Sequence, residues 1–412
     1  MIFSEGLQKR QTIFKDNRVF DKSWIPKNIL HRDEEIKEMA DNLAHVLRGE
    51  RAEDMMLYGK RGVGKTLVTK YVISELNRIT DQVKTYYISL REKKTRYAAW
   101  REIGRVVIGK ETTIKDTGAI TNQVFDMLCL LEQQSIILVI DEVNEVEEGY
   151  DNLLYFLLRP HEVAPKIANK KISCIFITND LKFPTQPPYG LSEGTLSSFK
   201  CMDKFVYPPY NATQLRDILS DRAQEGLIDG AYDETVIPMC AAYAAQENGD
   251  AREAIKILAK AAELASRNGA GKITEADVKK ARDGVEFDGM AKVINTLPTH
   301  QKVLALACIR DYKSQKRGDP EKGKSKTTTV YIEYKNMCQT IGLEPLGYRR
   351  IADFLSELET MGFIAVDTVY SRGKSNKITV LVPLDTEAVL TEDYRLKPFK
   401  DMPISRSRVE IL

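Results

Sequence analysis

The segment 59–66, GKRGVGKT, combines residue types and a spacing that bind phosphate. It matches the pattern GxxxxGK[ST] in full and lies between an apolar stretch and a segment with helical spacing. Its glycines allow backbone N–H groups to approach phosphate oxygens, Lys65 supplies positive charge, and Thr66 offers a hydroxyl to Mg²⁺. We therefore expect ATP or ADP with Mg²⁺ to bind at Gly59, Gly62, Val63, Gly64, Lys65, Thr66, Leu67 and Val68.

Polar residues at two later strand ends could complete a triphosphate site. Asp141 and Glu142 end the apolar run IILVIDE. Asp141 would bind Mg²⁺ through water, together with Thr66, and Glu142 would orient the attacking water. Asn179 follows the next strand and could position the same water, although a turn asparagine is the simpler alternative. Arg252 opens a later helix, where it could reach the phosphates or remain a solvated helix charge.

The elements that position these residues predict an α/β fold. Short, nearly all-apolar strands alternate with helical segments, which is typical of a parallel sheet buried on both faces. The expected strands are residues 55–58, 85–90, 136–140 and 172–178. From residue 212 to about 284 the pattern is helical only, with helix starts at Asp250 and Thr274.

The remaining chain has the layout of a winged helix. Four helices are expected at about 290–297, 300–315, 328–341 and 347–361, followed by two strands at 363–370 and 377–383. The domains expected are an N-terminal extension (1–27), a nucleotide-binding core (28–207), a helical lid (208–286), a winged-helix domain (287–386) and a C-terminal tail (387–412).

Two basic clusters occupy the places where a winged helix contacts DNA. Arg349 and Arg350 begin the expected recognition helix, and the basic turn 371–377 would enter a minor groove. Each cluster alone could be a solvated group of charges. The candidate DNA-binding residues are Tyr348, Arg349, Arg350, Arg372, Gly373, Lys374 and Lys377. The lysine-rich segment 313–326 is expected to be a mobile loop that adds non-specific attraction.

Composition limits the other classes of protein. A length of 412 residues favours two or three domains, and a net charge of +2 gives no overall nucleic-acid signal. Six scattered cysteines without a CxxC pair favour reduced thiols over zinc or disulfides, and four histidines make a histidine-rich metal site unexpected. No apolar run approaches the roughly 18 residues that span a bilayer, and no signal pattern opens the chain. We expect an intracellular protein without a membrane segment.

Taken together, these motifs resemble the archaeal replication initiators, which are relatives of the eukaryotic origin recognition complex and the cell-division-cycle-six loader. The resemblance covers about residues 24–385, and its most specific segments are IPKNILHRDEEI, YPPYNATQLRDIL, GDARE and YRRIADFLSELETMGFI. AAA+ ATPases in general share the first motifs but not this set. The resemblance implies an α/β AAA+ core, an all-helical lid and a C-terminal winged helix.

The resemblance also implies residue roles and partners. Tyr210 and Arg222 would line the nucleotide, although physical reasoning alone makes them a hinge aromatic and a surface helix charge. Residues 109–121 lie where the family carries a DNA-contacting insertion, with Lys115 as a candidate. The implied partners are double-stranded origin DNA, a replicative helicase of the minichromosome maintenance family and a paralogous initiator, in a prokaryotic cytoplasm at the nucleoid.

One departure from the family pattern concerns hydrolysis. Where family members usually offer an arginine to a neighbouring subunit's ATP, this chain has Gly194 or Thr195. Because such a residue contributes several orders of magnitude to turnover, we expect at most weak, switch-type hydrolysis and a divergent paralogue. Two alternatives stay open: a DNA-binding regulator with ATP as a structural ligand, and an AAA+ ATPase that acts on protein partners.

Overall fold

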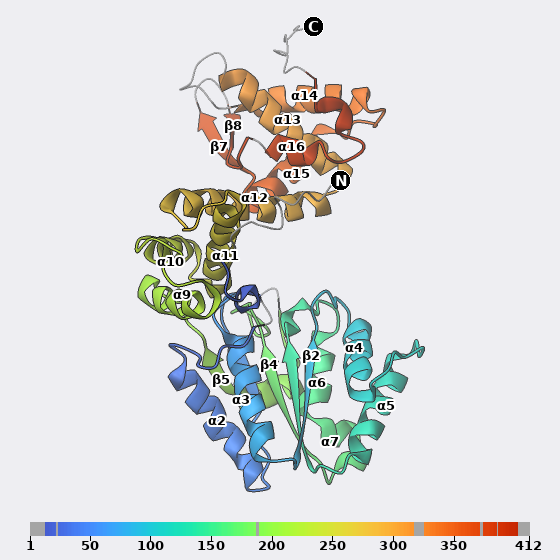
Figure 1. The fold of residues 1–412 in the computed structure, drawn as a ribbon. Helices are drawn as coiled ribbons and strands as arrows, with labels where there is room; N and C mark the ends of the chain where they lie inside the picture. Colours follow the sequence, from blue (N-terminus) through green and yellow to red (C-terminus); the bar gives the residue numbers. More distant parts are fainter. Residues whose placement is uncertain are drawn as a thin grey trace, which may run out of the picture. The chain divides into compact units, whose positions relative to one another are not determined.

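The computed structural model consists of two compact units, Met1–Ala281 and Arg282–Leu412, each described by itself below (Figure 1). It describes residues 13–21, 24–186, 189–316, 325–370, 374–384 and 386–402, with the backbone alone at 286–290, 292, 316, 368–370 and 374–375.

A five-stranded parallel sheet forms the centre of the first unit. Its strands have the spatial order β2-β3-β4-β1-β5, and their parallel registers bring all carboxyl ends to one edge. The strands are β1 (Met55–Tyr58), β2 (Val83–Ser89), β3 (Ser135–Asp141), β4 (Lys171–Ile177) and β5 (Asp203–Val206). The α/β fold class is confirmed. Strand β5 was not predicted, because its sequence DKFV is short, charged and largely exposed.

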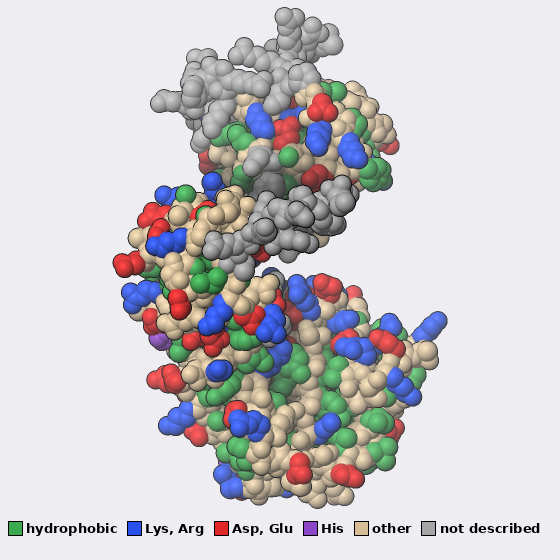
Figure 2. All heavy atoms as spheres, in the orientation of Figure 1, with side chains coloured by type: hydrophobic (Ala, Val, Ile, Leu, Met, Phe, Trp, Pro, Cys, Tyr) green, Lys and Arg blue, Asp and Glu red, His purple; other side chains and the backbone are tan. Residues whose placement is uncertain are grey.

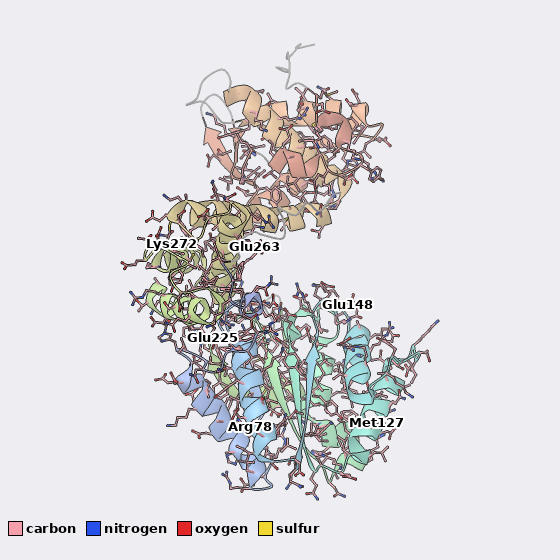
Figure 3. All side chains as sticks on the ribbon, in the orientation of Figure 1. Arg78, Met127, Glu148, Glu225, Glu263 and Lys272 are labelled. Atoms are coloured by element: carbon pink, nitrogen blue, oxygen red, sulfur yellow. The ribbon has the colours of Figure 1, made fainter. Side chains whose placement is uncertain are left out.

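Helices cover both faces of the sheet, as the apolar strands require. Ile137 and Val139 of β3 pack on the face with α2 (Asp33–Leu47) and α3 (Lys65–Ile79). Ile136, Leu138 and Ile140 pack on the other face. The helices of that face are α4 (Arg96–Ile108), α5 (Thr117–Leu130), α6 (Tyr150–Leu158) and α8 (Glu193–Lys200). Figure 3 labels Arg78 on α3 and Met127 on α5, on opposite sides of the sheet.

Short elements complete this unit. They are η1 (Asn17–Phe20), η2 (Val143–Glu145), α7 (Pro160–Val163) and η3 (Pro165–Ile167). Among the described residues, no helix is both long and apolar enough to cross a membrane. Figure 2 shows acidic and basic side chains interspersed on the visible face around the sheet, in keeping with a net charge of +2.

The lid consists of α9 (Ala212–Gly226), α10 (Val236–Glu247) and α11 (Ala251–Arg267), followed by the start of α12. Glu225 and Glu263 mark α9 and α11 in Figure 3. The Asp250 side chain accepts from the N–H groups of Arg252 and Glu253, which is the predicted helix start. The described part of the expected N-terminal extension packs on the lid: Lys15 N–H donates to the carbonyl of Gly226 at 2.9 Å.

Helix α12 differs from the prediction. It runs unbroken over Glu275–Thr296, whereas the sequence interpretation ended one helix near Gly284 and began another near Met290. The interpretation gave too much weight to the interior glycines. Each costs a helix only about 1 kcal/mol relative to alanine, which does not end it without a proline.

The second unit has the predicted winged-helix architecture. Helices α13 (Thr299–Lys316), α14 (Thr327–Thr340) and α15 (Tyr348–Thr360) pack around an apolar core with an antiparallel sheet of order β6-β8-β7. Its strands are β6 (Ser325–Lys326), β7 (Ile364–Tyr370) and β8 (Lys374–Val380). The two-residue strand β6 was not predicted, because it is too short to show alternation.

Three details of this unit correct the sequence interpretation. Strand β8 begins at Lys374, so Lys377 lies within the strand, paired with Asp367 and Lys326, and not in the turn. Lys313, expected in a mobile loop, lies in α13 and donates to Glu387. The expected tail contributes α16 (Thr386–Leu390) and η4 (Lys397–Phe399), whose residues Leu390 and Phe399 are buried in the core.

Candidate functional site

The phosphate loop, residues 59–66, connects β1 to α3 at the carboxyl edge of the sheet. Gly62 and Gly64 have φ values of +74° and +95°, which disfavour any residue with a side chain. A Cβ atom at Gly62 would overlap Asp250 Oδ1, and one at Gly64 would lie 2.8 Å from the Tyr210 hydroxyl. The lid and the segment before it therefore fit closely against the loop that would hold phosphate.

Lys65 begins α3, so its charge and the helix N-terminus are directed to the same place. Its Nζ atom donates to the carbonyls of Gly59 at 2.6 Å and Lys60 at 2.8 Å. Burial lowers the pKa of Lys65 to about 8. Three apolar residues were also predicted to bind nucleotide. Val63 and Val68 are both buried in the core, and Val63 and Leu67 each line one of the two cavities described below.

The two acids lie at the end of β3 as predicted, with Asp141 as its last residue and Glu142 directly after it. Asp141 Oδ2 accepts a hydrogen bond from Thr66 Oγ1 at 2.9 Å and another from the Tyr87 hydroxyl. Burial raises the pKa of Tyr87 well above its usual value, which keeps the hydroxyl a donor. Glu142 has a φ of +58°, a strained value for a side-chain-bearing residue. Ser89 Oγ lies 3.4 Å from Glu142 Oε2.

Asn179 is oriented by a residue that the sequence interpretation missed. Asn144 Nδ2 donates to Asn179 Oδ1 at 3.1 Å. Asn144 Oδ1 accepts from Thr178 Oγ1 at 3.0 Å. Asn144 belongs to η2, three residues after Asp141, and this proximity was the only sequence signal available. Because Asn179 Oδ1 accepts from Asn144, the Nδ2 group of Asn179 is the one left to face the site.

A single cavity, called here the phosphate cavity, brings most predicted residues together. Its predicted lining residues are Gly62, Val63, Gly64, Lys65, Thr66, Asp141, Glu142, Asn179 and Arg252. Arg91 after β2 and Arg61 add further positive charge. In the described part of the chain, the Arg252 guanidinium has no hydrogen-bond or ion-pair partner. Cationic groups opposite two carboxylates fit a triphosphate with Mg²⁺, which Thr66 and Asp141 would hold.

An adjoining cavity, the base cavity, shares Gly62, Gly64, Thr66 and Arg252 with the first. Its other walls are largely apolar and come from the N-terminal segment and the lid, including Phe20, Trp24, Ile29, Ile218 and Ile255. Trp24 Nε1 is buried, with no hydrogen-bond partner among the described residues. Apolar walls with an unpaired donor fit a nucleotide base.

Tyr210 and Arg222, which the resemblance predicts to line the nucleotide, both line the base cavity. Arg222 is only 6% exposed and donates to the carbonyl of Val19 at 2.8 Å. Burial lowers its pKa. The physical expectation of an exposed helix charge is therefore wrong, because the N-terminal segment covers this face of α9.

Arg32 is the largest omission of the sequence interpretation. It is 2% exposed and its Nε atom donates to Val63 O and to the Tyr210 hydroxyl, both at 3.0 Å. Its other nitrogens bond Pro208 O at 2.6 Å and Glu35 at 2.8 Å. One guanidinium thus joins the phosphate loop, α2 and the segment before the lid. Arg32 lies within IPKNILHRDEEI, one of the segments that carry the resemblance, but the sequence analysis assigned it no role in the site.

Gly194 and Thr195, where the resemblance predicts an arginine, lie in α8. Thr195 is fully buried in α8. The Gly194 carbonyl accepts from Arg159 Nη2 at 3.0 Å, and Arg159 Nε donates to Ser198 at 2.8 Å. Arg159 is held against α8 by these bonds, and the residues predicted there supply no cation of their own.

The candidate DNA-binding residues at the start of α15 are exposed. Tyr348 is 47% exposed and contacts Tyr331 edge-on. Arg350 lies over the Phe354 ring and 3.6 Å from Asp353, whereas Arg349 has no side-chain partner in the described ranges. Arg372 and Gly373 lie outside the described residues, as does the Lys374 side chain.

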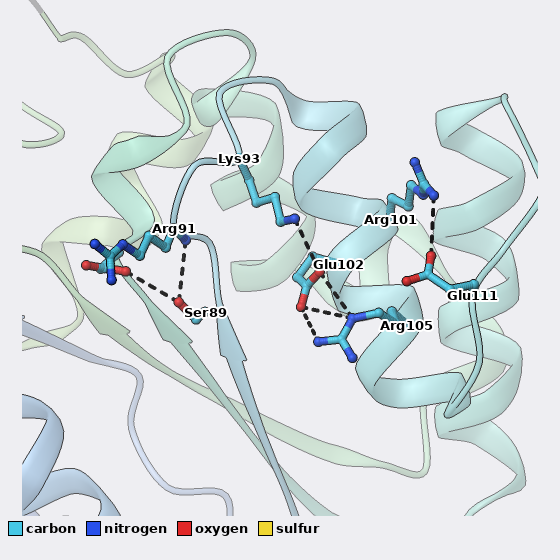
Figure 4. Close-up of polar contacts among 8 residues, drawn as sticks. Ser89, Arg91, Lys93, Arg101, Glu102, Arg105 and Glu111 are labelled. Atoms are coloured by element: carbon cyan, nitrogen blue, oxygen red, sulfur yellow. Dashed lines mark hydrogen bonds and ion pairs between the residues drawn. The ribbon is translucent and has the colours of Figure 1, made fainter. Parts of the chain in front are cut away.

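The expected insertion at 109–121 connects α4 to α5. Gly109 caps α4 in a left-handed conformation, and Asp116 caps α5. Lys115 is exposed on the connection. Figure 4 shows two arginines of α4 that are paired, Arg105 with Glu102 and Arg101 with Glu111.

Comparisons with known proteins agree with this architecture. Family models match residues 29–181 as an ATPase domain predominantly from Archaea. They match residues 216–283 as a Cdc6 AAA+ ATPase-type lid domain and residues 292–391 as a CDC6 C-terminal winged-helix domain.

Full-length relatives and a solved structure extend the match. The ORC1-type DNA replication protein of Thermococcus kodakarensis is 36% identical, covering 99% of this chain and 97% of the relative. That of Pyrococcus furiosus is 38% identical, covering 96% and 93%. The Aeropyrum pernix ORC1 protein, solved in complex with DNA, has a TM-score of 0.78 and 31% identity, covering 94% of this chain and 99% of that one. The chain therefore belongs to the family of ORC1-type DNA replication proteins.

Proposed function

We propose that this protein is an ATP-regulated replication initiator that binds double-stranded origin DNA and helps to recruit a minichromosome maintenance helicase. The observation that carries the proposal is the phosphate cavity, where Lys65, Asp141, Glu142, Asn179 and Arg252 meet in a chain that also has a winged helix. The DNA-bound ORC1 relative supports the DNA partner.

In the proposed site, each side chain has one task. Lys65 and the N-terminus of α3 bind the phosphates, and Arg252 approaches them from the lid. Thr66 and Asp141 hold Mg²⁺, which when bound neutralises charge on the β and γ phosphates. Glu142 orients the lytic water and Asn179, fixed by Asn144, holds it in line.

Regulation would act through the lid. The Ala251 N–H donates to the Gly62 carbonyl at 3.3 Å, and Asp250 lies against the same glycine. Loss of the γ phosphate would remove the partner of Arg252 and weaken this side of the lid. Differential binding of ATP and ADP to two lid states is the form that such regulation takes.

Anisotropy of a labelled duplex tests the DNA-binding part of the proposal. Duplexes from the host origin and duplexes of shuffled sequence are titrated in ATP, in ADP and without nucleotide. We expect tighter binding to origin sequence and a nucleotide-dependent affinity. A pull-down of the host helicase with ATP-bound and ADP-bound protein tests recruitment. Equal binding to origin and shuffled duplexes would contradict the initiator function.

A regulator that uses ATP only as a structural ligand is the second candidate. Buried Thr195 and the glycine before it favour this candidate, because neither can assist a neighbouring subunit. Single-turnover hydrolysis by the wild type and by Glu142→Gln separates the two. A hydrolytic switch predicts about a hundredfold slower turnover in the variant. A structural ligand predicts no difference.

A further inference from the structure

Strand β2 lies beside the two acids at the edge of the sheet. Its register pairs Tyr87 with Val139 and Ser89 with Asp141. Residues two apart point to the same face of a strand. Tyr87 and Ser89 therefore point to the same face, and their hydroxyls approach Asp141 and Glu142 respectively.

The contacts of Asp141 are asymmetric. Its Oδ2 atom accepts from both Thr66 Oγ1 and the Tyr87 hydroxyl, whereas within the described residues Oδ1 accepts no side-chain hydrogen bond. The terminal torsion of an aspartate is broad and two-fold, so an unheld carboxylate samples a wide range of orientations. Two donors on one oxygen remove that freedom and leave the other oxygen for the cavity.

The Tyr87 ring is held independently of its hydroxyl. Lys70 Nζ lies 4.6 Å from the ring centroid, and the ring packs beside the apolar cluster that contains Val139. Removing the hydroxyl alone therefore leaves the ring in place. Tyr86, the preceding residue, packs against the cluster on the opposite face and provides a matched control.

We propose that Tyr87 is a positioning residue for the magnesium-binding carboxylate, through the bond from its hydroxyl to Asp141. The inference rests on the proposed Mg²⁺–nucleotide site and deepens it. Residues that orient a metal ligand without contacting the metal commonly change metal affinity by about 10- to 100-fold when they are removed. Asp141 acts through water, so we expect the lower end of this range.

The test uses Tyr87→Phe with Tyr86→Phe as its control in the full chain. Equilibrium binding of a fluorescent ATP analogue is measured in EDTA and then as Mg²⁺ is titrated, without turnover. For Tyr87→Phe we expect analogue affinity in EDTA within about twofold of wild type and a Mg²⁺ midpoint about tenfold higher. Tyr86→Phe should match the wild type in both, and thermal unfolding verifies that each variant is folded.

Two results would overturn the inference. One is an unchanged Mg²⁺ midpoint in Tyr87→Phe. The other is an equal loss of analogue affinity with and without Mg²⁺, which would make Tyr87 a support of the loop only. A wild type that shows no Mg²⁺-dependent binding would instead contradict the proposed nucleotide site, and this outcome is distinct from both.

Discussion

The proposed nucleotide site and the proposed DNA-binding residues at the start of α15 would recognise charged ligands in opposite ways. At the proposed nucleotide site, Arg32, Asp141 and Arg222 are at most 8% exposed, and each already makes at least one hydrogen bond. At the start of α15, Tyr348 is 47% exposed and Arg349 has no side-chain partner among the described residues. Across the described ranges, most charged groups of the first surface are held by neighbouring residues, with the Arg252 guanidinium as the exception, whereas the second surface offers an exposed and unpaired arginine.

This difference has an energetic consequence. Removing one partner of a buried polar pair leaves the other unsatisfied, which costs more than the pair itself contributes. Removing an exposed cation from a DNA-binding surface removes one phosphate contact, and one counterion fewer is released when DNA binds. Substitutions should therefore have large, coupled effects at the first surface and small, additive, salt-dependent effects at the second.

The largest effect is expected for Lys65→Ala. Loss of a buried cation that would bond two phosphates should weaken ATP binding by about a hundredfold or more, since charge-assisted bonds contribute about 1.5–3 kcal/mol each. Lys60→Ala is the control, because Lys60 lies in the same loop but is exposed and bonds Asn248. Calorimetric titration with ATP measures both. A similar loss of ATP affinity in the two variants would contradict the distinction between the buried Lys65 and the exposed Lys60.

The next effect is on stability. Arg32→Met should lower the free energy of unfolding by about 3 kcal/mol, because Glu35, Tyr210 and two carbonyls lose their buried partner. The control is Arg78→Met, since Arg78 is 73% exposed and its one ion pair among the described residues is with Glu75. Urea unfolding of both variants makes the comparison. If Arg32→Met has the same free energy of unfolding as the wild type, the buried hydrogen-bond network around Arg32 does not stabilise the fold.

A smaller effect is expected at the DNA-binding face. Arg349→Ala should weaken duplex binding about fivefold and lower the salt dependence by about one counterion, with ATP affinity unchanged. Arg350→Ala should have less effect, because Asp353 and the Phe354 ring already engage its guanidinium. Duplex titrations at several salt concentrations measure both. A larger loss of duplex affinity in Arg350→Ala than in Arg349→Ala would show that the unpaired Arg349 is not the arginine that binds phosphate.

The smallest effect is expected for Lys377→Ala. Its place inside β8, opposite Asp367, removes it from the turn that would enter a groove. We expect duplex affinity to change by about twofold or less, because a partly exposed charge beside an opposite charge contributes little. The same duplex titrations measure this change. A loss of affinity as large as that of Arg349→Ala would show that Lys377 contacts DNA.

The sequence predicted those parts of the molecule that depend on local pattern. The glycine-rich loop, the central apolar strands and the start of α11 follow from spacing and capping, which act over a few residues. Strand β5 was missed, because an edge strand of four residues carries little pattern. The break placed in α12 was wrong, because interior glycines weaken a helix without ending it.

Within the candidate site, the missed residues act across long separations. Arg32 bonds Tyr210, 178 residues away, and Tyr87 bonds Asp141, 54 residues away. No pattern within one segment shows such contacts, since they exist only once the sheet and the lid are assembled. Phe20 and Trp24 were assigned to an extension for the same reason, and the structure places them at the base cavity.

Footprinting of origin duplex DNA tests the central claim, that one chain couples a nucleotide site to DNA binding. The wild type is compared in ATP, in ADP and without nucleotide, with Lys65→Ala as the variant that cannot respond. We predict a footprint whose extent or affinity differs between ATP and ADP in the wild type and is insensitive to nucleotide in Lys65→Ala. Identical protection of origin DNA by the wild type under all three conditions would contradict the account.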